Sequence, residues 1–239
     1  MAELAGLVVG LVLYSWLHNL AGTDVASATT NAQALQSVER SLNLDIEVAA
    51  NQWLAENPVL MQSAVLYYRL YYLPLAAVLL WVLFFRVEVF PAVCRTLVVM
   101  APLALLIFWL LPMSPPRFAL PGIVDIVAEH DLFGGGGSRD LTNGQNHFSA
   151  MPSMHVGWSG LCAYAAWLAA RGTHPRLALL AWLFPVGMVA VVITTGNHYV
   201  LDVAGTVLLL TISIAAAAAW DRWRRAWQDG SQTHMSPVS

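Results

Sequence analysis

A serine and a histidine lie where a helix is expected to begin, in residues 150–155 (Ala-Met-Pro-Ser-Met-His). Proline is favoured at the first position of a helix, because its missing N–H would have no partner there. The amide groups that follow point out of the helix end and make it a site for anions. Ser153 adds a hydroxyl donor to these amides, and His155 follows within the first turn. This motif therefore predicts an anion site with an imidazole beside it.

A second histidine lies in residues 196–202 (Gly-Asn-His-Tyr-Val-Leu-Asp), at the start of another apolar stretch. His198 and Asp202 are four residues apart, so we expect them on one face of a helix. Asp202 is then placed to accept the Nδ1–H of His198 and to leave Nε2 unprotonated, which is how a carboxylate orients a catalytic imidazole. A single pair of this kind is a weak signal.

A third polar motif, residues 113–117 (Met-Ser-Pro-Pro-Arg), ends in an arginine. The guanidinium group of Arg117 presents a rigid fork of N–H donors that suits phosphate oxygens. Each motif alone has an ordinary structural explanation, since a single interfacial histidine is more often solvated or packed. An ordinary structural explanation is much poorer for all three motifs together, if the fold brings them to one place.

The composition excludes several classes of protein. Of the 239 residues, 58% are hydrophobic and 10% are charged, whereas a soluble domain has about 25% charged residues. All eleven basic residues are arginine, and the net charge is −3. These values exclude a disordered protein, a nucleic-acid-binding protein and an ordinary cytosolic enzyme, and they favour an integral membrane protein. Cys94 and Cys162 make no disulfide scaffold and lie in no CxxC or Cys/His cluster, so we expect packed or lipid-facing thiols.

Six stretches have the length and apolar character of membrane-spanning helices, which need about 20 residues. They are residues 3–20, 64–85, 96–112, 153–170, 177–195 and 199–219. We therefore expect an all-α fold, a six-helix membrane bundle in a single domain over residues 1–239, with residues 221–239 as a cytoplasmic tail. The first stretch could instead be a signal peptide, but Glu3 precedes it and no arginine does, which favours a retained helix.

The connection between the first two spans, residues 21–58, is expected to contain an extra interfacial amphipathic helix. Apolar residues recur in it at helical spacing, at Val38, Leu42, Ile46, Ala49 and Trp53. Asp45, Glu47 and Asn51 fall largely elsewhere on the helical wheel. This pattern predicts a helix along the membrane surface, although a helix packed within the protein fits it equally well.

The arginines predict the orientation of the bundle. If six spans alternate, seven of the eleven arginines fall on one side: Arg86, Arg95, Arg171, Arg176, Arg222, Arg224 and Arg225. The positive-inside rule then places both termini in the cytoplasm and the connections 21–58 and 113–152 outside. All three polar motifs consequently reach the same outer membrane face, which the arginine positions did not require.

The connection 113–152 contains four consecutive glycines, residues 134–137, and is expected to form a mobile flap or a disordered spacer. It is no P-loop, because no Gly-Lys-Ser/Thr sequence follows the glycines. This connection also holds Asp125, Arg139, Asn146 and His147. Asp125 could contact a substrate hydroxyl, but acids in loops are more often solvated. Arg139, Asn146 and His147 could reach the site from the flap, but none of them alone is assigned a role.

The three motifs resemble those of the type 2 phosphatidic acid phosphatase superfamily. Within it, the chain looks most similar to the branch that includes inositol phosphorylceramide synthases. The resembling residues are 115–117, 152–155 and 195–202, and the resemblance spans roughly residues 35–215. It implies a six-helix membrane bundle with its site at the outer membrane surface and with no metal or other cofactor.

The resemblance also implies a role for each matched residue. His198 matches the nucleophile of the family, His155 the general acid and base, and Asp202 the partner of the nucleophile. Ser153 and Arg117 match phosphate-binding positions.

The chain departs from the broad family at three positions. Leu110 and Val192 replace a lysine and an arginine that are frequent in relatives, and Met154 replaces a frequent glycine. The phosphate pocket has thus lost two cations, which suits a phosphodiester better than a monoester dianion.

The sequence therefore predicts a membrane phosphotransferase that acts on a lipid phosphate ester through a phosphohistidine, similar to inositol phosphotransferases. The expected substrate is a phospholipid or a polyprenyl phosphate, with a polyol as possible acceptor and with no nucleic-acid partner. A lipid phosphate phosphatase, with water as acceptor, uses the same residues and stays open. A non-catalytic lipid-binding or transport protein is the third alternative, and it needs neither histidine.

Overall fold

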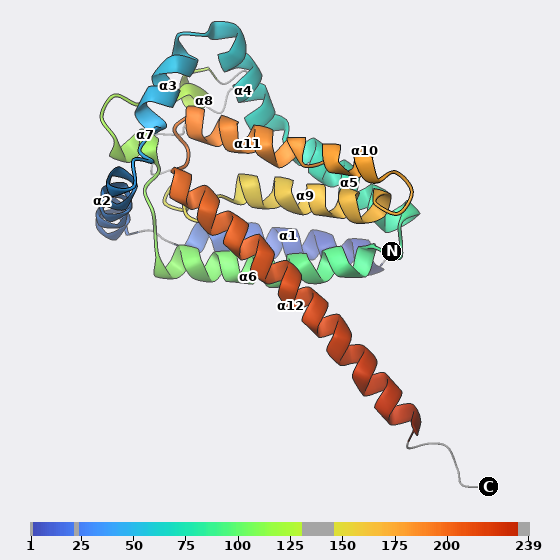
Figure 1. Ribbon diagram of the computed structural model, residues 1–239. Coiled ribbons are helices and arrows are strands. Elements are labelled where there is room, and N and C mark those ends of the chain that lie inside the picture. The colour runs from blue at the N-terminus through green and yellow to red at the C-terminus, as the bar shows by residue number, and fades with distance from the viewer. Residues whose placement is uncertain (1, 22–23, 131–145, 234–239) are drawn as a thin grey trace, which may run out of the picture.

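The computed structural model describes residues 2–21, 24–130 and 146–233. Every regular element in these ranges is a helix, as the sequence predicts (Figure 1). The helices are α1 (Ala2–Leu20), α2 (Val25–Ser41), α3 (Glu47–Ala55), α4 (Pro58–Leu70), α5 (Tyr72–Phe85), α6 (Phe90–Leu110), α7 (Pro116–Ala119), α8 (Ile126–Glu129), α9 (Met154–Ala170), α10 (Pro175–Leu180), α11 (Leu183–Thr194) and α12 (Val200–Thr233). Arg139 and the glycine run at 134–137, with the central part of the expected flap, lie outside the described residues.

Helix α9 lies at the centre of the bundle and contacts α5, α6, α10, α11 and α12 (Figure 1). A small residue permits its close approach to α12, because a Cβ added to Gly160 would lie 2.7 Å from Leu210 Cδ2. The N-terminal ends of the two helices also meet, since the Thr206 hydroxyl donates to the Ser153 carbonyl oxygen at 3.2 Å. The two histidine motifs precede these two helix ends, so this packing brings them together.

Among the described residues, three helical segments are long and apolar enough to cross a membrane by length and composition. They are Phe90–Leu110, Pro175–Thr194 and Val200–Gln228, and they correspond to three of the predicted spans. A fourth span is formed if Pro58–Leu70 and Tyr72–Phe85, which are bent by 41°, count as one. Helices α1 and α9, the counterparts of predicted spans 3–20 and 153–170, are not among them. The structure therefore supports three or four spans, and the count of six stays a prediction.

The connection 21–58 forms two helices, α2 and α3, and the prediction of a single amphipathic helix is wrong. The chain turns between them at Asn43, which adopts a left-handed φ of 56° that asparagine tolerates. The predicted apolar stripe (Val38, Leu42, Ile46, Ala49 and Trp53) is exposed along its whole length. Glu39, Glu47 and Asn51 are buried instead. The apolar face thus points outward, as contact with lipid requires, and the polar face packs against the bundle.

Helices α2, α3, α7 and α8 gather at one end of the bundle, together with the starts of α9 and α12 (Figure 1). Helix α12 runs through the bundle and continues beyond its opposite end to Thr233, so the predicted tail 221–239 begins inside a helix (Figure 1). The end of the bundle that holds α2, α3, α7 and α8 positions the residues of the candidate site.

Candidate active site

His198 lies in a tight turn between α11 and α12, two residues before the helix begins. The N–H groups of Asn197 and His198 both donate to the Val192 carbonyl oxygen, at 3.0 and 3.1 Å. Gly196 permits this turn with a φ of 70°, and a Cβ there would lie 2.6 Å from Ile123 Cγ2. The prediction that His198 shares a helix with Asp202 is therefore wrong in detail, although the two side chains still meet.

The Nδ1 atom of His198 lies 2.7 Å from the carbonyl oxygen of Ala150 and 3.4 Å from Asp202 Oδ2. A carbonyl oxygen only accepts, so Nδ1 carries the proton and Nε2 of the neutral ring presents a lone pair. Asp202 Oδ2 itself accepts the Tyr199 N–H at 2.8 Å. The expected Nδ1 partner, Asp202, is thus the more distant one, and a backbone carbonyl holds the imidazole.

A short backbone pairing fixes the carbonyl that holds His198. The N–H of Met113 donates to the Phe148 carbonyl oxygen at 2.7 Å, and the N–H of Ala150 donates to the Met113 carbonyl oxygen at 3.2 Å. Met113, Ala150 and Tyr199 also pack in one buried cluster. The first polar motif after α6 therefore supports the segment that orients the histidine.

His155 faces His198, and the centres of their two rings are 6.0 Å apart. Two tyrosines hold its ring: Tyr68 stacks on it at 4.2 Å with an interplanar angle of 22°, and Tyr71 packs at 4.7 Å. In the part of the chain that the structure describes, no hydrogen bond holds either ring nitrogen of His155. The ring is thus fixed by its faces and open at its edge.

Ser153 is the N-cap residue of α9, with an extended φ and ψ of −71° and 100°. The helix begins at Met154, so Pro152 does not occupy the first helical position as expected. Ser153 is completely buried, and its hydroxyl oxygen lies among described residues without a hydrogen-bond partner. This unused hydroxyl and the free amides of the first turn are donors available to an anion.

Arg117 lies in the single turn α7 and is tied to the turn that carries His198. Its backbone N–H donates to the Gly196 carbonyl oxygen at 2.9 Å, and its guanidinium donates to the side-chain oxygen of Asn197. The Nε atom of Arg117 lies 3.6 Å from Oδ2 of Asp125, which is completely buried. Asp125 also caps α8 through the Ala128 N–H at 3.2 Å. The expectation of a solvated loop acid is therefore wrong, because Asp125 holds the arginine of the site.

The remaining residues of the connection 113–152 lie at the edge of the site. Asn146 donates to the His18 carbonyl oxygen at 3.0 Å, and its own side-chain oxygen accepts the Phe148 N–H at 2.9 Å. His147 is buried with its ring edge against Phe118, at 5.9 Å between centres. Both residues have structural contacts, so they provide no reacting group that the structure identifies.

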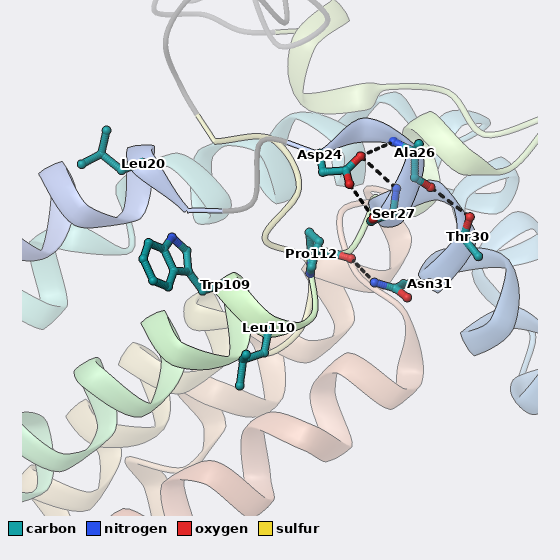
Figure 2. Close-up of a pocket in the computed structure, with 9 residues that line it drawn as sticks. All are labelled: Leu20, Asp24, Ala26, Ser27, Thr30, Asn31, Trp109, Leu110 and Pro112. Carbon is teal, nitrogen blue, oxygen red and sulfur yellow. Dashed lines mark hydrogen bonds between the residues drawn. The ribbon is translucent and has the colours of Figure 1, made fainter.

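An open pocket of about 660 Å³ lies outside this group of residues, between the start of α2 and the ends of α1 and α6 (Figure 2). Its lining residues are Leu20, Asp24, Ala26, Ser27, Thr30, Asn31, Trp109, Leu110 and Pro112. Hydrogen bonds from the Ser27 side chain and backbone hold the pKa of Asp24 below its usual value. No candidate catalytic or phosphate-binding residue is among the residues that line this pocket.

Comparison with known families identifies the chain. The PAP2 superfamily matches residues 33–216, which include both histidine motifs and Arg117. The chain belongs to the PAP2 superfamily. Membership indicates an enzyme of the phosphatase type that acts on lipid phosphates as a phosphatase or a phosphotransferase. Comparisons with curated proteins and with solved structures give no match.

Four contacts of this PAP2 site carried no signal in the sequence. Tyr68 and Tyr71 come from the bend between α4 and α5, where aromatic residues resemble ordinary packing. Asn197 accepts hydrogen bonds from both Arg117 and the Tyr68 hydroxyl. In the sequence it lies next to His198 in the motif, and nothing there assigns it a role. The Ala150 carbonyl is a backbone atom that any residue supplies.

Proposed function

We propose that this PAP2 protein is a membrane phosphotransferase that acts on a lipid phosphate ester through a phosphohistidine at His198. One observation carries the proposal: the imidazole of His198 faces that of His155, while the Ala150 carbonyl retains the proton on Nδ1. The nucleophilic Nε2 atom is thereby available without prior loss of a proton.

In the first step, Nε2 of His198 attacks phosphorus in line with the leaving oxygen. A P–N bond forms, the P–O bond breaks, and protonated His155 gives its proton to the departing alkoxide. Neutral His155 then takes the proton of an acceptor hydroxyl, whose oxygen attacks phosphorus and breaks the P–N bond. The cycle returns both imidazoles to their starting states.

Two groups of donors would hold the phosphate oxygens as charge develops. The Ser153 hydroxyl and the first amides of α9 form one group, and the guanidinium of Arg117 forms the other. Loss of one such donor typically reduces kcat by about 10²–10³-fold. Asp202 would stabilise the His198 ring when it bears positive charge in the intermediate, since the two groups lie 3.4 Å apart.

The charge balance of the site favours a phosphodiester as substrate. Arg117 shares its charge with the buried carboxylate of Asp125. Val192 is completely buried and Leu110 is mostly exposed, so neither position supplies the cation found there in many relatives. A phosphodiester carries one negative charge and needs less compensation than a monoester dianion. This supports an inositol-phosphotransferase-like activity with an alcohol acceptor over hydrolysis of a monoester.

The proposal includes a membrane topology and the absence of a metal. Six spans with both termini in the cytoplasm would place the two histidines at the outer face, within reach of lipid headgroups. The proposed mechanism routes no step through a metal.

Trapping of the covalent intermediate tests the proposal. Purified protein in detergent is incubated with a phosphorus-labelled phospholipid, quenched at alkaline pH and digested for mass spectrometry. We expect an acid-labile adduct on His198 in the wild type and none in His198→Asn. Addition of inositol or another polyol should yield a new phosphodiester. An adduct that appears equally in His198→Asn would overturn the mechanism. Products of hydrolysis alone (a phosphomonoester from a phosphodiester substrate, or free phosphate from a monoester), with no product that contains the polyol, would assign the phosphatase.

A further inference from the structure

Two buried acids lie directly behind the histidine turn. Glu39 on α2 and Glu47 on α3 retain 0% and 1% of their surface exposed. Glu39 Oε1 accepts the Leu201 N–H at 2.7 Å, and Glu47 Oε1 accepts the Val200 N–H at 3.1 Å. Both acids therefore bind the first turn of α12.

Together with Asp202, three carboxyl groups accept hydrogen bonds from three successive backbone N–H groups. Asp202 Oδ2 accepts the Tyr199 N–H, and Glu47 and Glu39 accept the next two along the chain. A helix N-terminus stabilises negative charge with a partial charge of only about +0.5. Three full negative charges exceed what this helix end compensates.

The described residues provide no cation for the two glutamates. The nearest arginine in sequence, Arg40, points outward and lies 4.0 Å from the exposed Asp45. Glu39 Oε2 is buried and accepts no hydrogen bond from a described donor. The titratable groups that face Glu39 are the Glu47 and Asp202 carboxyls, with the Tyr199 hydroxyl nearby. An uncompensated buried carboxylate is unfavourable, so one group of this set retains a proton.

The direction of the Glu39 pKa agrees with a retained proton in this set. Burial raises the pKa of Glu39 to about 8. The Leu201 amide opposes this shift, and the negative charges of Glu47 and Asp202 act in the same direction as burial. The arrangement resembles paired carboxylates that share one proton because both cannot ionise together.

We infer that Glu39 and Glu47 share one proton and that this carboxyl pair is a positioning device for the turn that carries His198 and Asp202. The pair ties α2 and α3 to α12 through one hydrogen-bonded carboxyl group each. Its single negative charge suits the helix end, whereas a second would repel Asp202 and displace the His198 turn. The effect on catalysis rests on the proposed function, but the shared proton does not.

The pair makes stability depend on pH in a defined direction. Below pH 4.5 the carboxyl of Glu39 is protonated whether the chain is folded or unfolded. Between pH 4.5 and about 8 the unfolded chain loses this proton while the folded chain keeps it. Folding stability therefore falls as pH rises through this window. Above it, the ionised pair should also disturb the nucleophile.

The substitution Glu39→Gln imitates the protonated acid. Its amide oxygen can accept the Leu201 N–H, and its NH₂ group can donate to Glu47, at any pH. Glu56→Gln is the matched control, since it removes the same charge from an exposed position at the end of α3. Thermal midpoints and kcat and KM for a phospholipid are measured for each protein from pH 6 to 9.

We expect the wild-type and Glu56→Gln midpoints to fall with pH and the Glu39→Gln midpoint to stay level. Wild-type kcat should drop to about a tenth by pH 9, with little change in KM, as one group of pKa near 8 ionises. In Glu39→Gln this alkaline limb should move up by at least one pH unit. If Glu39→Gln does not fold, Glu47→Gln is the second variant, because either acid of the pair can be replaced by its amide.

A Glu39→Gln protein with the pH dependence of the wild type in both midpoint and kcat would overturn the inference. A loss of phosphate transfer in every protein tests the proposed function and not the carboxyl pair. If no variant transfers phosphate but the midpoints still differ as expected, the carboxyl pair stands and the proposed function fails.

Discussion

His198 and His155 face each other across 6.0 Å, yet the protein holds them by different kinds of contact. His198 is held at its edge, by a carbonyl oxygen at 2.7 Å and a carboxylate at 3.4 Å. His155 is held on its faces, by the rings of Tyr68 and Tyr71. Edge contacts fix the position of a proton, whereas face contacts fix only the plane of the ring.

The difference matches what each ring must do in the proposed cycle. A nucleophile must present the same lone pair at every turnover, so a permanent acceptor at Nδ1 of His198 is useful. A general acid and base must lose and regain a proton within one cycle. The stacked ring of Tyr68 and the tilted ring of Tyr71 restrain His155 without favouring one tautomer. Substitutions that act on one ring and spare the other test this comparison.

The largest effect is expected for His198→Asn. The asparagine NH₂ group can still donate to the Ala150 carbonyl oxygen, so the turn should keep its structure while the nucleophile is lost. Because the covalent route is removed, kcat should fall by at least about 10⁴-fold. Steady-state turnover of a short-chain phospholipid measures this. Retention of a tenth of wild-type kcat would show that His198 is not the nucleophile.

His155→Asn should reduce kcat by about 10²–10⁴-fold, and the loss should depend on the leaving group. An alkoxide needs a proton to depart, whereas a nitrophenolate does not. The first-turnover burst of nitrophenol from an aryl phosphate ester should therefore be slowed less than tenfold. Stopped-flow measurement of the burst distinguishes the two steps. An equal loss for alkyl and aryl leaving groups would contradict the role of His155 as acid.

Asp202→Asn should be milder than the loss of a carboxylate in a catalytic triad. There the carboxylate alone sets the tautomer, and its amide reduces kcat by about 10⁴-fold. Here the Ala150 carbonyl already retains the proton on Nδ1 of His198. We therefore expect a loss of only about 10–100-fold, from the missing charge beside the imidazolium. A 10⁴-fold loss would assign the tautomer to Asp202 instead of the carbonyl.

The sequence could predict which residues meet but not every contact that holds them. The sequence places His155, His198 and Arg117 beside apolar stretches at one predicted membrane face. In the structure the two histidine rings are 6.0 Å apart, and Arg117 is bonded to the turn that carries His198. The Ala150 carbonyl carries no signal, since every residue has one. Asp125 resembles a solvated loop acid until its distance of 3.6 Å from Arg117 is known.

Helical periodicity has a similar limit in α2 and α3. The spacing of Val38, Leu42 and Ile46 predicts a stripe but does not state which face of the helix meets the protein. The structure turns the stripe outward and buries Glu39 and Glu47, against the usual preference of acids for water. Apolar length alone likewise does not fix the number of spans. Helix α9 has only 17 residues, yet it lies at the centre of the bundle.

The smallest effect is expected at the tyrosines that contact the face of His155, which the sequence did not predict. Tyr68→Leu removes the ring that stacks on His155 at 4.2 Å, whereas Tyr68→Phe keeps the ring and removes only a 3.4 Å hydrogen bond to Asn197. An aromatic pair contributes about 0.5–1.5 kcal/mol, so kcat should fall about 2–10-fold in the leucine variant and less than twofold in the phenylalanine variant. Because the stack restrains His155 and leaves His198 untouched, the phosphohistidine should still accumulate in Tyr68→Leu. Equal losses in the two variants would mean that the hydroxyl and its bond to Asn197, not the ring face, position the general acid.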